Sequence, residues 1–275
     1  MALLLLLSLS ACKGSSKDKP SPAASPSDAA STDAPAVPTV DLSFVRGTIV
    51  IAAEHDHHHV EARALDPATG AWTPLGASSE LSLFPTGHVV RGGILVIATE
   101  GETQADHVEQ LALVRGDAVE PFGPKAGAVR NPTVSADGAV IVVETSEQNF
   151  RDLYKIDAAG ATSRLTSNRE GNFEPSLSPD AAHVVFSSSR DGDSEIYRAP
   201  IRGGAATRLT AFHKDDWSPL WSPDGKHVAF LSDREGPPRL FLMSPDGTAQ
   251  RRATEETDVD VAEDLPRWSP DGARL

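Results

Sequence analysis

The sequence predicts an all-β protein, a β-propeller of four-stranded blades, on three observations. A Ser-Pro-Asp-Gly turn at Ser222–Gly225 recurs, with variations, at intervals of 43 to 47 residues. Each interval contains four short strand-like segments with apolar alternation, and no segment outside the N-terminal leader shows helical periodicity. Units of about 44 residues with four strands are typical of propeller blades. We therefore expect five complete units and the start of a sixth.

The residue types of the repeated turn follow from backbone geometry. Proline presets the second turn position, aspartate accepts hydrogen bonds from the following amides, and glycine adopts the positive φ that other residues resist. The aligned positions hold Gly47, Gly93, Gly138, Ala181, Gly225 and Gly272, and the aspartates that precede several of them are Asp137, Asp180, Asp224 and Asp271. Because Ala181 replaces glycine, we expect that corner to use another conformation or to carry modest strain.

Two further motifs keep the same spacing. Leu165-Thr166, Leu209-Thr210 and Ala253-Thr254 lie 44 residues apart, and Ser-x-Arg-x-Gly occurs at Ser188–Gly192 and Ser232–Gly236. Together with the turn and the tryptophan-bearing strand before it, this pattern resembles the TolB-type propeller repeat. The resemblance is specific from about Asn131 to the C-terminus and fainter over Phe44–Phe122.

The resemblance implies a propeller, commonly six-bladed, that serves as a rigid platform for protein partners in the bacterial envelope. The same repeat also forms the propeller in front of an α/β-hydrolase domain in the prolyl oligopeptidase family. TolB-like proteins carry an α/β domain before the propeller, whereas a linker precedes it in this sequence.

The first twelve residues read as a lipoprotein leader. The apolar run Leu3–Leu7 is too short to span a bilayer, and it ends in Leu-Ser-Ala-Cys, which resembles a bacterial lipobox. We expect lipidation at Cys12, the only cysteine of the chain. The alternative is an ordinary secretory leader with an incidental cysteine. Lys13 follows the cysteine, and the sorting pattern that this resembles predicts the periplasmic face of the outer membrane.

Residues 13–40 predict a disordered tether, because serine, proline and alanine dominate and no aromatic residue occurs. The propeller is expected to be a single domain over residues 41–275. The formal net charge of −14 argues against nucleic-acid binding, which requires a basic surface, and suits solubility or a basic patch on a partner.

The C-terminal motif leaves two closures open. Leu265–Ser269 either completes the first blade of a five-bladed ring or begins a sixth blade. Because Val40–Val45 already resembles the first strand of blade one, the pattern favours a six-bladed ring that is truncated at its C-terminus.

A histidine-rich loop is the candidate metal site. In His55–His59 and the residues that follow, alternation along an extended chain places His57, His59 and Glu61 on one side, a plausible ligand set for Zn, Ni or Cu. A polar hairpin loop is the alternative, which the pattern favours. No other cofactor is expected.

For two other clusters, the pattern favours a structural role over a binding role. Asp191–Glu195 partly matches a calcium loop, but its spacing is incomplete, so we expect a turn with solvated acids. Trp217, Trp221 and Trp268 could line a sugar- or peptide-binding face, yet their position before the turn favours core packing between blades.

Compact catalytic signatures are missing from the sequence: it contains no GxSxG elbow, HExxH motif, phosphate-binding loop or CxxC pair. We therefore expect a non-catalytic lipoprotein that binds an envelope protein and is attached to the membrane through its lipid. The alternatives are the propeller of a longer hydrolase of the prolyl oligopeptidase type, and a carbohydrate-binding or lyase propeller that uses His57 or His59 with a metal.

Overall fold

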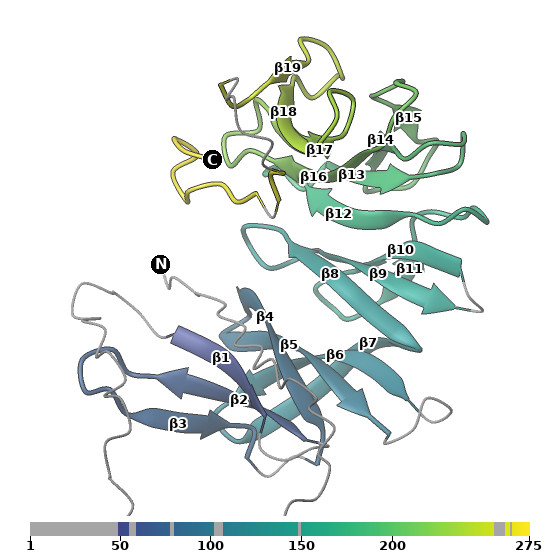
Figure 1. Cartoon of the computed structure of the whole chain (residues 1–275). Helices are drawn as coiled ribbons and strands as arrows, with labels where there is room; N and C mark the ends of the chain where they lie inside the picture. Colours follow the sequence, from purple (N-terminus) through teal and green to yellow (C-terminus); the bar gives the residue numbers. More distant parts are fainter. Residues whose placement is uncertain are drawn as a thin grey trace, which may run out of the picture.

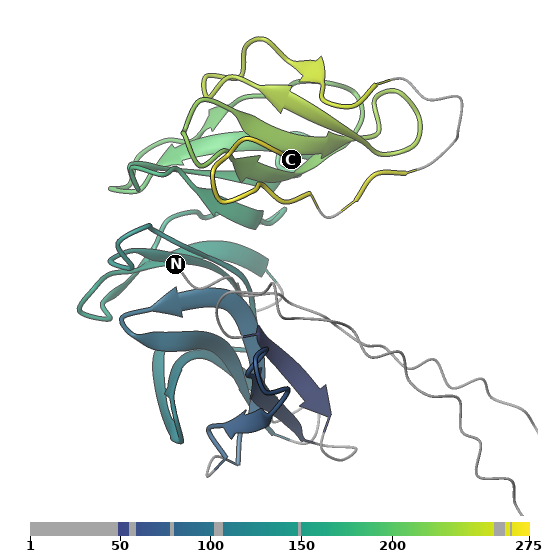
Figure 2. The same ribbon diagram turned by 90° about the vertical axis from the view of Figure 1, so that its left-hand side faces the viewer.

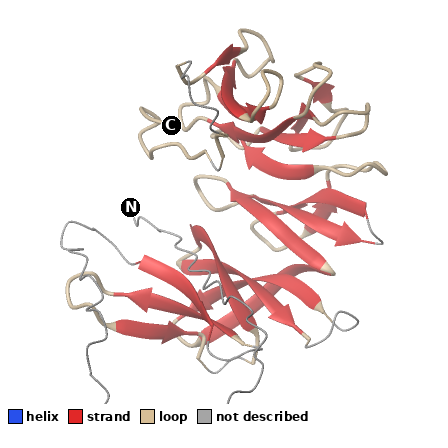
Figure 3. Cartoon of the chain, in the orientation of Figure 1, coloured by secondary structure: helices blue, strands red, loops and turns tan. Residues whose placement is uncertain are grey.

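The computed structural model describes residues 49–54, 59–77, 80–101, 107–147, 150–255, 262–264 and 266–275, and these residues form strands and loops. Figure 3 shows strands throughout, without a helix in the described part of the chain. Accordingly, the described ranges contain no helix with the length and apolar character of a membrane crossing. The predicted all-β class is confirmed.

The strands form five antiparallel sheets, numbered here in chain order. Sheet 1 contains β1 (Ile49–Glu54), β2 (Val60–Leu65) and β3 (Trp72–Leu75). Sheet 2 contains β4 (Ser82–Val90), β5 (Gly93–Glu100), β6 (Val108–Arg115) and β7 (Ala118–Ala126). Sheet 3 contains β8 (Ala128–Val134), β9 (Ile141–Glu147), β10 (Phe150–Ile156) and β11 (Thr162–Arg164).

The last two sheets repeat this plan. Sheet 4 contains β12 (Phe173–Leu177), β13 (His183–Ser188), β14 (Glu195–Pro200) and β15 (Thr207–Arg208). Sheet 5 contains β16 (Asp216–Trp221), β17 (Val228–Ser232), β18 (Arg239–Met243) and β19 (Arg251–Arg252). Each strand pairs with the next one along the chain, so every sheet is a simple meander, as expected for propeller blades.

The sheets follow one another along an arc, as Figure 1 shows and the turned view in Figure 2 supports. The first strands β4, β8, β12 and β16 lie on the inside of the arc, where β12 contacts both β8 and β16. The arc is open between sheet 1 and the C-terminal segment. This is the arrangement of propeller blades around an axis.

Apolar side chains from neighbouring sheets interlock between the blades. Val142 and Leu153 of sheet 3 form one cluster with Val184, Phe186 and Tyr197 of sheet 4. Phe186 is completely buried, and burial of such a side chain contributes about 1.5–3 kcal/mol. Because both faces of a blade are covered, strands such as β17 are buried at every position, which explains their uninterrupted apolar sequence.

The innermost strands share a bulge that the sequence analysis did not identify. Gly87, Asn131, Glu174 and Ser218 occupy equivalent positions with φ between 48° and 87°, and the strand register shifts at each of them. The bulges turn polar groups toward the adjacent blade. The carboxylate of Glu174 accepts hydrogen bonds of 2.8 Å from both the backbone N–H and the hydroxyl of Ser218.

The repeated turns use their serine as well as their aspartate. In the turn at Ser222, the hydroxyl donates to Asp224 at 2.7 Å and accepts from the N–H of His227 at 2.9 Å. Asp224 in turn accepts from the N–H of Lys226. The turns that begin at Ser135, Ser178 and Ser269 repeat this pattern around Asp137, Asp180 and Asp271. Gly138, Gly225 and Gly272 have φ of 70°, 72° and 69°.

Two turn predictions need correction or fall outside the structure. Gly93 is the first residue of β5 and is not a turn glycine, because β4 and β5 are joined by the two residues Arg91 and Gly92, both with positive φ. Alignment by spacing missed this shorter hairpin. Gly47 lies outside the described residues, as do Cys12, the leader and the tether. For Ala181, either another conformation or modest strain was expected. It keeps the turn conformation, with φ of 52°, which is the strained alternative.

The C-terminal segment lies beside sheet 5. The indole N–H of Trp268 donates to the carbonyl of Leu220 at 3.3 Å, and Gly272 lies over Pro223. Its described residues do not extend sheet 1, whose described strands are β1, β2 and β3 alone. The described part of the segment therefore lies next to β16, where a further blade would begin.

Replacement of Ala181 by glycine is expected to stabilise the protein. An L-residue in the left-handed region lowers the free energy of unfolding by about 1–2 kcal/mol. Glycine avoids this strain, but its more flexible unfolded chain lowers the free energy of unfolding by about 0.4–1 kcal/mol. Ala181→Gly should therefore raise the free energy of unfolding by about 0.5–1 kcal/mol in urea denaturation. Ala182→Gly, at a neighbouring position without positive φ, is the control and should lower it. Equal effects of the two substitutions would contradict the strain.

The turn aspartates are expected to make stability depend on acid pH. Hydrogen bonds from the Ser222 hydroxyl and then from the Lys226 N–H lower the pKa of Asp224 from 3.8 to about 2. Because the folded pKa lies below the unfolded one, the stabilisation is complete above about pH 4 and is lost as the pH falls through 2. Asp224→Asn should therefore show a shallower loss of unfolding free energy between pH 4 and pH 2 in urea titrations. Parallel curves for both proteins would refute this.

Candidate functional site

The Arg-Leu-Thr motif organises a buried polar cluster in sheet 3. The Thr166 hydroxyl accepts from the N–H of Leu153 at 2.9 Å and donates to the Asp152 carboxylate at 3.0 Å. Arg164 donates to the same carboxylate and to the carbonyl of Thr166. Asp152 is almost completely buried, so these partners replace the water that it loses. The motif therefore ties the outermost strand to the third strand of the blade.

Glu195 is the equivalent carboxylate of sheet 4, and its environment corrects a prediction. The sequence predicts solvated acids in Asp191–Glu195, but Glu195 is completely buried. It accepts from Arg208 at 2.6 Å, from the Thr210 hydroxyl at 2.5 Å and from the N–H of Phe212 at 2.8 Å. Burial raises the pKa of Glu195, although the hydrogen bonds from Thr210 and Arg208 act in the opposite direction. Its position is structural.

Sheets 2 and 5 fill the same strand position differently. Glu109 of β6 is buried and accepts from Arg130, from the N–H of Val129 and from His107. Burial opposes the charged form, yet these hydrogen bonds outweigh it and lower the pKa of Glu109. In sheet 5 the position holds Arg239, and Glu263 supplies the carboxylate that accepts from the N–H of Leu240.

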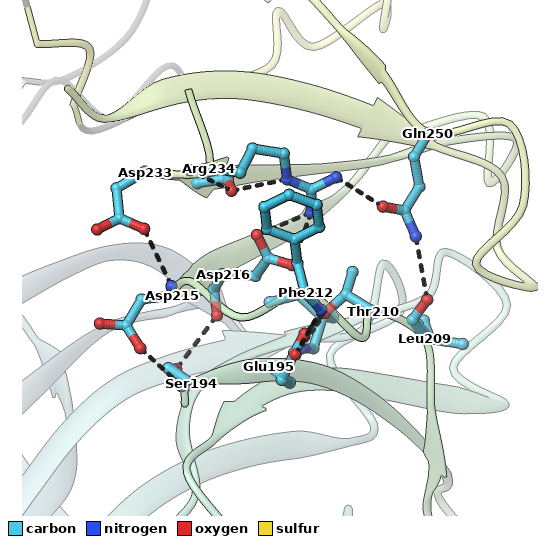
Figure 4. Close-up of polar contacts among 12 residues, drawn as sticks. Ser194, Glu195, Leu209, Thr210, Phe212, Asp215, Asp216, Asp233, Arg234 and Gln250 are labelled. Carbon is cyan, nitrogen blue, oxygen red and sulfur yellow. Dashed lines mark hydrogen bonds and ion pairs between the residues drawn. The ribbon is translucent and has the colours of Figure 1, made fainter. Parts of the chain in front are cut away.

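The Ser-x-Arg motif places a guanidinium at a blade junction, as Figure 4 shows for Arg234. Arg234 donates to both oxygens of the fully buried Asp216, at 2.9 and 2.7 Å, and to the Ser232 hydroxyl at 2.9 Å. Its guanidinium carbon lies 5.0 Å from the ring centre of Phe212 and 4.7 Å from that of Phe241. The ion pair, in which one guanidinium nitrogen donates to both carboxylate oxygens, and the aromatic rings hold this cation in place.

Arg190 repeats the arrangement one blade earlier with a neutral partner. It donates to the Ser188 hydroxyl at 3.2 Å and to the Asn172 side-chain carbonyl at 2.6 Å. Its guanidinium carbon lies 4.4 Å from the ring centre of Tyr197. Asn172 therefore stands where sheet 5 has Asp216.

Sheet 3 departs from this arrangement and contains a cavity. Its equivalent of Ser188 and Ser232 is Thr145, and the position of the arginine is taken by Glu147. A cavity of about 500 Å³ is lined by Thr145, Phe150, Asp152, Tyr154, Arg164, Ser167, Asn168 and Arg169. The cavity was not predicted from the sequence, although the missing arginine in an otherwise regular motif was the signal that could have indicated it.

Two residues of the cavity lining each have a buried side-chain oxygen without a hydrogen-bond partner among the described residues. Thr145 is 1% exposed, and its hydroxyl has no hydrogen-bond partner among the described residues. The same holds for the side-chain carbonyl of Asn168, whose amide donates to Asn172 and Ser188. Phe150 is 42% exposed and provides an aromatic wall. The volume of the cavity and its mixture of polar and aromatic lining residues make it the candidate binding site.

The predicted metal ligands are only partly within the structure. The loop between β1 and β2 joins the first two described strands of its sheet, and His55, Asp56, His57 and His58 lie outside the described residues. His59 is half-buried, and the Glu61 carboxylate accepts two hydrogen bonds from Arg63, at 2.9 and 3.1 Å. Within the described ranges, no three metal-binding side chains come together.

Of the three tryptophans expected to pack between blades, Trp221 does so most clearly. Trp221 is 8% exposed in the cluster between sheets 4 and 5, whereas Trp217 and Trp268 are half-buried. The expected core role is confirmed for Trp221.

Comparison with known proteins identifies the repeat. Residues 102–218 match the family model described as the TolB beta propeller domain. This part of the chain is similar to the TolB repeat, and the described sheets have the fold of a β-propeller. None of the curated proteins matches its sequence.

Solved structures with the same fold include two TolB proteins. The TolB structure from Agrobacterium tumefaciens is 22% identical over 70% of this chain and 73% of its own, with a TM-score of 0.56. That from Acinetobacter baumannii is 18% identical over 88% and 67%, with a TM-score of 0.54. A puromycin hydrolase is 20% identical over 76% of this chain but 38% of its own, with a TM-score of 0.63. At these identities the likeness establishes the fold.

Replacement of Arg234 is expected to lower the free energy of unfolding more than replacement of Arg190. Arg234→Met leaves the buried Asp216 carboxylate without its cation, which costs about 3–5 kcal/mol of unfolding free energy. Arg190→Met leaves only the neutral Asn172 side chain, for which about 1–3 kcal/mol is expected. Urea denaturation measures both, and Asp216→Asn combined with Arg234→Met should recover part of the loss. Similar costs for the two single variants would contradict the role of the buried charge.

Proposed function

We propose that this chain is a non-catalytic scaffold that binds a protein partner in the bacterial envelope. The observation that carries the proposal is the way in which hydrogen bonds fix one blade to the next. Glu174 bonds Ser218 of the next inner strand, and Glu195 bonds the connection that leads into sheet 5. Loops that emerge from such a frame keep fixed relative positions, as a broad recognition surface requires.

The proposed location combines the fold with the leader. The TolB-type propeller supports an envelope location, and the lipobox-like sequence ending in Cys12 supports attachment to the outer membrane through a lipid. The acidic chain, with a formal net charge of −14, favours partners with basic patches.

Affinity purification from membranes tests this function. The full chain with a C-terminal tag should retain a specific envelope protein after gentle solubilisation, and Cys12→Ser should move the chain from the membrane to the soluble fraction. Recovery of no envelope protein by the membrane-bound chain, together with saturable binding of a glycan, would refute the scaffold role. Unchanged fractionation of Cys12→Ser would refute the anchor.

The alternative is the propeller of a longer hydrolase. It is favoured by the likeness to the puromycin hydrolase, of which this chain covers 38%. A Gly-x-Ser-x-Gly elbow encoded downstream of Leu275 in the same reading frame would distinguish this alternative from a scaffold.

A further inference from the structure

In sheets 4 and 5, the arginine of the outermost strand is paired with a carboxylate from the hairpin between the second and third strands. Arg208 lies opposite Tyr197 in the strand register, and its guanidinium pairs with Asp191 at 3.4 Å. The Tyr197 hydroxyl donates to the same carboxylate. In sheet 5 the equivalent pair is Arg252 and Glu235, at 3.5 Å. The repeat therefore places a carboxylate beside this arginine in two successive blades.

Sheet 3 has the same arginine and tyrosine but a different hairpin sequence. Arg164 lies opposite Tyr154 in the strand register, as the corresponding pair does in sheet 4. The residue at the sequence position of Asp191 is the neutral Gln148, which lies outside the described residues. The cavity of about 500 Å³ lies at this place, since both Arg164 and Tyr154 line it. The blade therefore keeps the groups that surround a carboxylate in sheet 4 and has a cavity beside them.

The lining of this cavity carries hydrogen-bond donors and an excess of positive charge. Of its described residues, Arg164 and Arg169 are cations and Asp152 is the acid, so two positive charges stand against one negative charge. Arg169 and Ser167 are exposed, and neither has a hydrogen bond or ion pair with another described residue. Guanidinium and hydroxyl groups are donors that bind a carboxylate, and Phe150, 42% exposed, adds an aromatic wall.

We propose that this cavity binds a carboxylate group presented by a protein partner. The bound carboxylate takes the place that Asp191 occupies in sheet 4 and accepts hydrogen bonds from Arg169 and Ser167. The inference rests on the proposed function in taking a protein as the source of the carboxylate. The formal net charge of −14 repels anions at long range, but charges more than about 8 Å away are largely screened at physiological ionic strength.

A peptide titration tests the proposal with the purified full chain. The probes are a blocked Gly-Glu-Gly tripeptide, the same peptide with glutamine, which is neutral and nearly isosteric, and inorganic phosphate, followed by NMR at the backbone N–H groups of Ser167 and Arg169. The glutamate peptide should bind saturably and at least about tenfold more tightly than the glutamine peptide, because an ionised acceptor makes stronger hydrogen bonds to guanidinium groups. Absence of saturable binding, equal binding of the two peptides, or tighter binding of phosphate would overturn the proposal.

Two variants separate the site from the general charge of the chain. Arg169→Gln should weaken binding of the glutamate peptide at least about fivefold without lowering the melting temperature, because Arg169 has no partner among the described residues. Ser167→Ala should weaken it about two- to tenfold, because it removes one neutral donor. The matched control is Arg202→Gln, at an exposed arginine in the turn between β14 and β15, which should leave binding unchanged. Equal weakening by Arg169→Gln and Arg202→Gln would reveal a long-range effect of charge and overturn the site.

Failure of this test and failure of the proposed function are distinguishable. If a partner is recovered from membranes but no probe binds the cavity, the partner uses another surface and only the carboxylate site is refuted. If the glutamate peptide binds but no partner is recovered, the site stands and the scaffold role is refuted.

Discussion

The structure depends on the sheets in the middle of the arc burying both of their faces against neighbouring sheets. In sheet 4, Phe186 packs toward sheet 3, and Ile196 packs toward sheet 5. Polar side chains at such junctions lose their water, so each needs a partner within the fold. Glu195 meets this constraint with hydroxyl, backbone and guanidinium donors, and Asp216 meets it with the guanidinium of Arg234. The polar repeat motifs are the means by which a stack of apolar sheets tolerates charges between its blades.

The repeats satisfy this constraint with different residues, and the differences are informative. Sheet 5 exchanges the carboxylate of the third strand for Arg239 and recovers a carboxylate from Glu263, so the hydrogen bonds are kept although the charge is reversed. Sheet 3 keeps Thr145 but not the arginine that would contact it, and the hydroxyl has no partner within the described chain. The substitution in sheet 5 is therefore compensated by another residue, whereas the substitution in sheet 3 leaves the Thr145 hydroxyl unsatisfied within the described chain.

Regular spacing supported correct predictions, and its local exceptions led to errors. The turns at Asp137, Asp180, Asp224 and Asp271 form as expected, because the hydrogen bonds that stabilise them lie within six residues. The prediction for Gly93 is wrong because a two-residue hairpin replaces the longer turn while the spacing changes little. Glu195 was expected in solvent because its neighbours in sequence are polar, but the strand that it begins carries it between two blades.

The sequence by itself determined the length of the blade, its four strands, its turns and the positions of its threonine and arginine motifs. All of these are set by backbone geometry and by contacts between residues that are close along the chain. Only the tertiary structure decided which charges are buried, how Glu174 joins one inner strand to the next, and that Thr145 and Asn168 line a common cavity. These features depend on residues 20 to 45 positions apart that meet when one blade packs on another, and local patterns carry no information about such distances.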